Sequence, residues 1–137
     1  MTPIHAPMDE ERLNTLGVLN LAHVGDAVYE LLVRQSLARH SAASIREQHK
    51  NTIAYVSAPA QAAAAEHLLP QLTAEEHKIF RRGRNTRVHG VPAGCTIAQY
   101  HAATALETLF GWLWLSGRRE RIMELFAVIW EKDDDAS

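Results

Sequence analysis

LAHVGDAVYELLVR, residues 21–34, is the most informative stretch of this 137-residue chain. Along it and its flanks, from Leu13 to His40, apolar residues recur at helical spacing and no proline intervenes. Apolar residues lie on both flanks of this predicted helix, which is typical of a helix at the centre of a domain. Asp26 interrupts the pattern. Burying a carboxylate there costs free energy unless a cation, a metal ion or several hydrogen-bond donors contact it.

The polar residues of this helix also have simpler interpretations. Gly25 before Asp26 is a common helix-capping sequence, so Asp26 could begin a new helix, although the apolar period continues through Gly25 without a break. Glu30 has the spacing of an ion pair with Arg34, which we favour over a role at a metal site. His23 shares the face of Asp26. We expect His23 to be a partly buried structural residue.

The rest of the chain is also predicted to be helical. Ser44 to Glu47, Thr73 to Glu76 and Thr96 to Gln99 are capping-box sequences that mark helix starts, whereas Pro59 and Pro70 mark a restart and an end. No strand is convincing. The fold class is therefore all-α, with one helical domain at residues 13–131, a flexible N-terminal segment at 1–12 and an acidic tail at 132–137. The expected helices cover about residues 13–40, 44–57, 58–69, 73–82, 96–115 and 119–131.

Composition excludes several classes of protein. The chain is 47% hydrophobic and 22% charged, as in globular domains and unlike disordered chains. Its longest nearly unbroken apolar run, Leu109 to Leu115, is too short to span a membrane. A single cysteine, Cys95, excludes an internal disulfide framework and cysteine-rich zinc sites. We therefore expect a cytoplasmic protein with no membrane segment.

The net charge of −2 hides an uneven distribution. Acidic residues gather at both ends of the chain, whereas the body from Arg12 to Trp130 has a surplus of positive charge. Four arginines fall within seven residues, before and inside a glycine-containing loop at residues 83–95. Such a cluster is a candidate anion-binding site, although each arginine alone could be an ordinary solvated residue. The four are Arg81, Arg82, Arg84 and Arg87.

A second carboxylate, Glu107, lies on another apolar helix. Gly25 and Gly111 each cost their helices about 1 kcal/mol relative to alanine, so each is expected to have a packing reason. Close approach of the two helix backbones is a simple reason, and it would bring Asp26 near Glu107. Two buried carboxylates repel unless they share a proton or a divalent cation. Pairing of Glu107 with an arginine is the alternative.

Three separated segments together resemble Mini-ribonuclease III, the short bacterial relative of ribonuclease III. They are LAHVGDAVYELLVR (21–34), RRGRNTRVHG (81–90) and ATALETLFGWLWL (103–115). YVSAPAQAAA (55–64) is similar to the second helix of the family, although Pro59 departs from its pattern. The resemblance covers about residues 13–125. It implies an all-helical homodimer with a ribonuclease III-like endonuclease domain, which cleaves double-stranded RNA with Mg²⁺ and trims the ends of precursor 23S ribosomal RNA.

The resemblance also implies roles for individual residues. Asp26 and Glu107 match the metal-binding catalytic carboxylates of the superfamily. Longer ribonuclease III proteins have two further acidic residues where this chain has Ala22 and Thr104, as in the short family, so the number of metal ions stays open. His23 is a candidate to orient metal-bound water, and so is Glu30. The implied products carry 5′-phosphate and 3′-hydroxyl ends.

Binding and assembly follow from the same resemblance. Duplex RNA presents mainly shape, phosphates and 2′-hydroxyls, which suit a cluster of basic and amide side chains. Cutting both strands requires two sites related by a two-fold axis, so we expect a homodimer. A ribosomal protein is a further candidate partner. The predicted RNA-binding residues are Arg81, Arg82, Arg84, Asn85 and Arg87. Four apolar residues are expected to form either the dimer interface or part of the monomer core: Leu109, Phe110, Trp112 and Leu113.

Two other functions fit parts of the sequence. A non-catalytic helical RNA-binding or ribosome-associated protein would use only the arginine cluster. A helical metallohydrolase would use some of the eight histidines, but the sequence contains no H-E-x-x-H or E-x-x-H motif. The first is therefore the alternative to an endoribonuclease.

Overall fold

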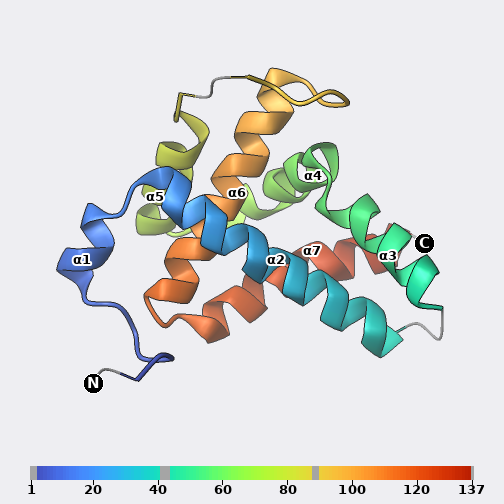
Figure 1. The fold of residues 1–137 in the computed structure, drawn as a ribbon, viewed down its shortest axis with the longest axis horizontal. Coiled ribbons are helices and arrows are strands. Elements are labelled where there is room, and N and C mark those ends of the chain that lie inside the picture. The colour runs from blue at the N-terminus through green and yellow to red at the C-terminus, as the bar shows by residue number, and fades with distance from the viewer. Residues whose placement is uncertain (1–2, 41–43, 88–89, 137) are drawn as a thin grey trace.

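The computed structural model describes residues 3–40, 44–87 and 90–136, and for 132–136 only the backbone. The described residues form helices, turns and loops without a strand, so the predicted all-α class is confirmed (Figure 1). No helix in these ranges is long and apolar enough to cross a membrane. The helices are α1 (Glu10–Thr15), α2 (Val18–His40), α3 (Ile45–Val56), α4 (Ala58–Leu68), the 3₁₀ turn η1 (Leu69–Gln71), α5 (Ala74–Arg84), α6 (Ile97–Leu115) and α7 (Arg119–Ala136).

Two of the predicted capping boxes are complete. At the start of α5, the Thr73 hydroxyl accepts a hydrogen bond from the Glu76 amide at 3.1 Å, and the Glu76 carboxylate accepts one from the Thr73 amide at 2.9 Å. Thr96 and Gln99 make the same two bonds at the start of α6, at 3.1 and 2.9 Å. Each box satisfies two amides that the first helical turn leaves without partners, and so fixes where the helix begins.

Helices α3 and α4 also begin at capped residues. The Ser44 hydroxyl accepts a hydrogen bond from the Glu47 amide at 3.2 Å, which confirms this half of the third predicted box. Ser57 ends α3 and caps α4, because its hydroxyl accepts from the Ala60 amide at 3.4 Å. Pro59 lies in the first turn of α4, where a missing amide hydrogen costs nothing. The predicted restart at Pro59 is confirmed.

Four helix boundaries differ from the prediction. Helix α1 begins at Glu10, inside the predicted flexible segment at 1–12, because Asp9 caps it there. The predicted helix at 13–40 is two helices, because Leu16 is extended, with φ −70° and ψ 135°, and ends α1 before Gly17. Helix α5 continues two residues further, to Arg84, and α7 continues past Glu131 to Ala136. No proline or glycine lies between residues 131 and 136 to stop α7. Residues 1, 2 and 137 of the predicted terminal segments lie outside the described residues.

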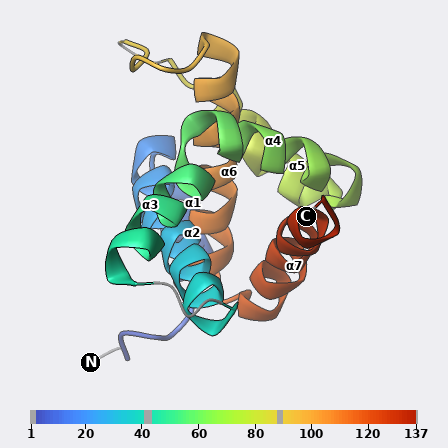
Figure 2. The ribbon, with the colours of Figure 1, turned by 90° about the vertical axis from the view of Figure 1, so that its right-hand side faces the viewer.

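Helix α6, and not α2, is the central helix. It packs against α2, α4, α5 and α7, and Figures 1 and 2 both show it running through the middle of the bundle. Helix α2 has one open face, on which Leu19 is 63% and Leu31 56% exposed, so the expectation that both its flanks are covered was wrong. The α6 residues predicted as a possible dimer interface fill the monomer core instead. Buried there are Leu109, Phe110, Trp112 and Leu113.

Two glycines allow α2 and α6 to cross in backbone contact. A Cβ atom at Gly25 would overlap the backbone carbonyl of Glu107 and lie 2.8 Å from the backbone nitrogen of Gly111. A Cβ atom at Gly111 would overlap the backbone carbonyl of Leu21. Real Cβ atoms do not approach backbone atoms this closely, so only glycine fits at either position. The predicted close approach of the two helices is confirmed.

Candidate active site

The crossing of α2 and α6 brings Asp26 and Glu107 together. Asp26 directly follows Gly25, and the backbone of Glu107 is the surface that Gly25 contacts. The two carboxyl groups lie within hydrogen-bonding distance of each other. Their predicted proximity, across eighty residues of intervening chain, is therefore confirmed. Helix α2 continues through Gly25 without interruption, so the alternative that Asp26 caps a new helix was wrong.

The two carboxyl groups differ in their surroundings. Asp26 is exposed, which corrects the expectation that it is buried, because it lies on the open face of α2. Glu107 is half-buried. Burial, followed by the hydrogen bond and the repulsion from Asp26, raises the pKa of Glu107 from 4.5 to about 8. No arginine forms an ion pair with Glu107 in the described part of the chain, so the predicted alternative pairing was also wrong.

This raised pKa predicts how the stability of the metal-free protein depends on pH. Between pH 4.5 and about 8, the folded protein keeps a proton on Glu107 that the unfolded chain has lost. The stabilisation is therefore complete below pH 4.5 and is lost as the pH rises through about 8. Urea unfolding in EDTA should show a falling free energy of unfolding across this window. In Glu107→Gln, whose side chain stays neutral, the free energy of unfolding should fall less steeply with pH. An equal decline in the wild type and this variant would contradict the assignment of the raised pKa to Glu107.

Gln61 completes the surroundings of Glu107 and was not predicted as a site residue. It lies on α4 and is 2% exposed, and its side-chain amide donates a hydrogen bond to Glu107. Gln61 and Glu107 both line a cleft of about 390 Å³ that is also lined by Tyr100, Thr104 and residues 92–95 of the loop before α6. The only sequence signal was a lone polar residue in the alanine-rich run APAQAAAA.

The other two residues predicted near Asp26 are on the surface of α2. Glu30 forms an ion pair with Arg34, with 3.0 Å between Oε2 and the guanidinium nitrogen, so the favoured interpretation of Glu30 is confirmed. His23 is exposed, which corrects the expectation of a partly buried structural residue. It remains on the open face of α2 with Asp26.

The arginine cluster lies at the end of α5 and just beyond it. Arg81, Arg82 and Arg84 occupy the last turn of α5, Asn85 ends the helix, and Arg87 follows in the loop. All five side chains are exposed, and none of them forms an ion pair with another described residue. The positive charge of the four arginines is therefore available to an anion from solution.

Close packing joins this end of α5 to the helix that carries Glu107. Gly83 is buried in the middle of the cluster, and a Cβ atom there would lie 2.8 Å from the Cα of Ala105 and 2.7 Å from the hydroxyl of Thr108. These α6 residues flank Glu107 in the sequence. The basic end of α5 is thus held against the segment of α6 that contains the acidic pair.

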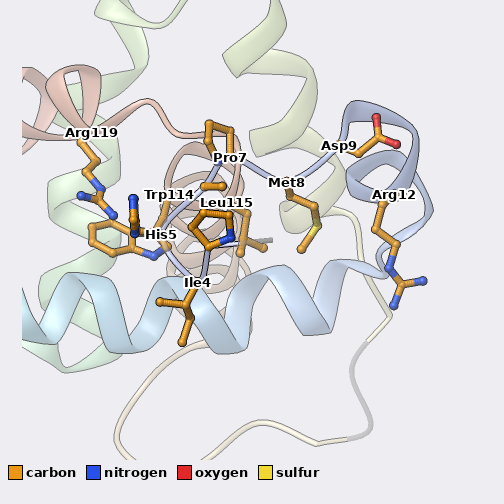
Figure 3. A pocket seen from close by; sticks show the side chains of 11 residues that line it. Ile4, His5, Pro7, Met8, Asp9, Arg12, Trp114, Leu115 and Arg119 are labelled. Carbon is orange, nitrogen blue, oxygen red and sulfur yellow. The ribbon is translucent and has the colours of Figure 1, made fainter. Parts of the chain in front are cut away.

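A larger cavity of about 740 Å³ lies away from the acidic pair, between residues 3–9 and the turn from α6 to α7 (Figure 3). The N-terminal segment covers it and is fixed by a 2.7 Å hydrogen bond from the Met8 amide to the Leu115 carbonyl. The guanidinium of Arg119 lies 4.6 Å from the centre of the Trp114 ring. Figure 3 shows these two side chains beside each other. Neither Asp26 nor Glu107 lines this cavity. It is formed where the N-terminal segment packs against the end of α6 and the start of α7.

A divalent cation suits the donors at the acidic pair. Mg²⁺ prefers oxygen ligands and in phosphoryl-transfer sites binds through one or two carboxylates together with substrate phosphate. Two carboxyl groups that contact each other repel when both are ionised, and a shared cation removes that repulsion. The described residues contain no group of three or more histidine, cysteine, aspartate or glutamate side chains placed to hold a metal ion. The Asp26–Glu107 pair supplies two carboxylate groups of the kind that Mg²⁺ prefers.

Comparisons with known proteins identify the family of this chain. Residues 19–118 match the family model of the ribonuclease III domain. The chain is 43% identical to Mini-ribonuclease 3 of Symbiobacterium thermophilum, over 81% of this chain and 85% of the relative. It is 36% identical to Mini-ribonuclease 3 of Thermoanaerobacter sp., over 86% and 83%. A crystal structure of a Fusobacterium nucleatum protein superposes with a TM-score of 0.79, at 27% identity, over 88% of this chain and 97% of that one. The chain therefore belongs to the Mini-ribonuclease 3 family of RNA-cleaving nucleases, which have a ribonuclease III domain.

Proposed function

We propose that this protein is a Mg²⁺-dependent endoribonuclease that cleaves double-stranded RNA, with Asp26 and Glu107 as its catalytic carboxylates. The contact between these two groups, at the glycine crossing of α2 and α6, is the observation that carries the proposal. Family membership supplies the reaction class. The resemblance to Mini-ribonuclease III further supports precursor 23S ribosomal RNA as the substrate in the cytoplasm, with a ribosomal protein as a candidate further partner.

Asp26 and Glu107 would hold the cation, and the rest of the site would place the RNA against it. When bound, Mg²⁺ supplies the positive charge that activates water and neutralises the leaving oxygen in phosphodiester hydrolysis. Asp26 is exposed and so can face the substrate, whereas Glu107 is held from behind by α4. Departure of the 3′-oxygen leaves 5′-phosphate and 3′-hydroxyl ends.

A cleavage assay separates this proposal from its alternative. A structured duplex RNA incubated with the purified protein should be cut in Mg²⁺ and left intact in EDTA, and the products should carry 5′-phosphate ends. A protein that binds the duplex but does not cut it at any Mg²⁺ concentration would instead be the non-catalytic RNA-binding protein. That alternative rests on the exposed arginine cluster alone.

The arginine cluster should set the affinity for RNA. Arg82→Ala combined with Arg84→Ala should weaken binding to all duplexes, because phosphate contacts do not read sequence. The slope of log affinity against log salt should become shallower by about 2, because each arginine that binds a phosphate contributes about 1 to the slope. Titrations at several salt concentrations measure both effects. Arg39→Ala with Arg46→Ala, which removes two exposed arginines on α2 and α3, is the matched control. Equal effects of the two double variants would remove the α5 cluster from the RNA interface.

The open face of α2 supports a homodimer. Leu19, His23, Ala27 and Leu31 are all exposed and follow one another at intervals of four residues, so they form one stripe of the helix. Exposed apolar residues in such a stripe mark an interaction surface. We propose that a second copy covers this stripe. Asp26 lies to one side of the stripe, about 100° around the helix from Ala27, so it would remain open to RNA, and the two sites of the dimer would cut the two strands.

A charge placed in this stripe should dissociate the dimer. Leu19→Glu combined with Leu31→Glu would bury four unpaired carboxylates in the two-fold interface, which is costly. Size-exclusion chromatography with light scattering should give a dimer for the wild type and a folded monomer for the double variant. Met123→Glu changes an exposed apolar residue on α7 and should remain dimeric. A monomeric wild type would mean that the protein does not dimerise. A double variant that remains dimeric would mean that the interface lies elsewhere.

A further inference from the structure

Gln61 is a buried polar residue of α4 whose side chain contacts Glu107 of the acidic pair on another helix. Among the other described buried polar residues, three threonines bond to carbonyls one turn earlier in their own helices: Thr52 to Gln48, Thr104 to Tyr100 and Thr108 to Thr104. Glu76 bonds to the α5 cap and to Arg121 on α7. The side chain of Gln61 instead donates to Glu107, a carboxylate of the acidic pair. Burying an amide costs free energy unless a hydrogen bond compensates it. For Gln61, the hydrogen bond that offsets this cost is made to Glu107, a carboxylate of the acidic pair.

Helix α4 holds Gln61 in place. The backbone amide of Gln61 donates to the Ser57 carbonyl at 2.9 Å, so Gln61 lies in the first turns of a capped helix. Ala64 and Ala65 are buried beyond it, and small residues let α4 approach α6 closely. Figures 1 and 2 both show α4 beside α6. With 2% of its surface exposed, the Gln61 side chain has little freedom to turn away.

A neutral donor suits a carboxylate that must bind a cation. An arginine or lysine at this position would neutralise Glu107 and compete with the metal ion, whereas an amide orients the carboxylate and leaves its charge in place. A single amide donor occupies only one of the lone pairs of the carboxylate, so others remain for a cation. We propose that Gln61 is a positioning residue, whose side-chain amide fixes the Glu107 carboxylate so that Glu107 and Asp26 bind one cation. This inference rests on the proposed metal site.

Metal affinity tests the proposal independently of cleavage. Mn²⁺ prefers the same oxygen ligands as Mg²⁺, and its free concentration is measured by electron paramagnetic resonance. Gln61→Met keeps the length and burial of the side chain but cannot donate, so Mn²⁺ affinity should fall roughly 10- to 100-fold. Thr108→Val, the control, removes a buried hydroxyl from the residue after Glu107 and should lower the unfolding temperature without changing Mn²⁺ affinity. Wild-type Mn²⁺ affinity in folded Gln61→Met would overturn the proposal.

A second measurement uses the wild-type protein, so it does not depend on whether Gln61→Met folds. In nitrogen-15 NMR spectra, a side-chain amide proton of Gln61 should exchange with water more slowly than those of Gln35, which is exposed on α2. Glu107→Ala should shift the Gln61 amide resonances and abolish this protection. Unchanged Gln61 resonances in Glu107→Ala would overturn the proposal. Asp26→Asn identifies the other kind of failure, because unchanged Mn²⁺ affinity in that variant would reject the metal site itself.

Discussion

Gly25→Ala should destabilise the protein by about 3 kcal/mol or more, at or above the upper end of the usual cost of overpacking. The added methyl group would overlap the carbonyl of Glu107 and approach the nitrogen of Gly111, and both are backbone atoms within a helix. A side chain can rotate away from such a contact, but a helix backbone can yield only if α2 and α6 separate. Because domains are stable by only about 5–15 kcal/mol, a loss of this size removes much of the total.

Urea unfolding measures this loss, and Gly17→Ala is the matched control. A Cβ atom at Gly17 would have no heavy atom within 4 Å, so this variant should unfold at nearly the wild-type urea concentration. Equal stability of Gly25→Ala and Gly17→Ala would mean that α2 and α6 do not cross in backbone contact. The geometry that brings Asp26 to Glu107 would then be wrong as well.

Asp26→Asn, in contrast to Gly25→Ala, should keep the fold and lose the cleavage activity. Asp26 is exposed, and asparagine has the same shape, so the variant should fold. Removing the negative charge also relieves the repulsion that helps to raise the pKa of Glu107. Cleavage should nevertheless fall roughly 10³-fold, the loss typical of removing a group that stabilises charge in the transition state.

Single-turnover cleavage of a duplex RNA measures the effect of Asp26→Asn, and circular dichroism checks its fold. Glu66→Gln is the control, because it neutralises an exposed carboxylate on α4 and should cut at the wild-type rate. A folded Asp26→Asn variant that cuts as fast as the wild type would exclude Asp26 from the mechanism.

Local chemistry made much of the fold predictable. Capping residues such as Thr73 and Thr96 satisfy amides within their own turn, so a short sequence is enough to predict the helix start. The glycines at 25 and 111 were informative for a similar reason, since a residue that costs a helix free energy implies a compensating contact. That contact proved to be the crossing that joins Asp26 to Glu107.

What covers each helix face was not predictable. Apolar spacing along α2 did not reveal that Leu19 and Leu31 are exposed, because periodicity identifies a face but not the element that packs on it. The exposure of Asp26 and His23 follows from the same open face. Gln61 was missed because its partner lies on another helix, and no local pattern in α4 indicates which residue its amide contacts.

Mn²⁺ binding to the metal-free protein, measured by electron paramagnetic resonance, tests most directly whether Asp26 and Glu107 share a divalent cation. The wild type should bind Mn²⁺ in competition with Mg²⁺, and both Asp26→Asn and Glu107→Gln should lose this binding while remaining folded. The same Mn²⁺ affinity in the wild type and both variants, or no binding by the wild type, would contradict the account.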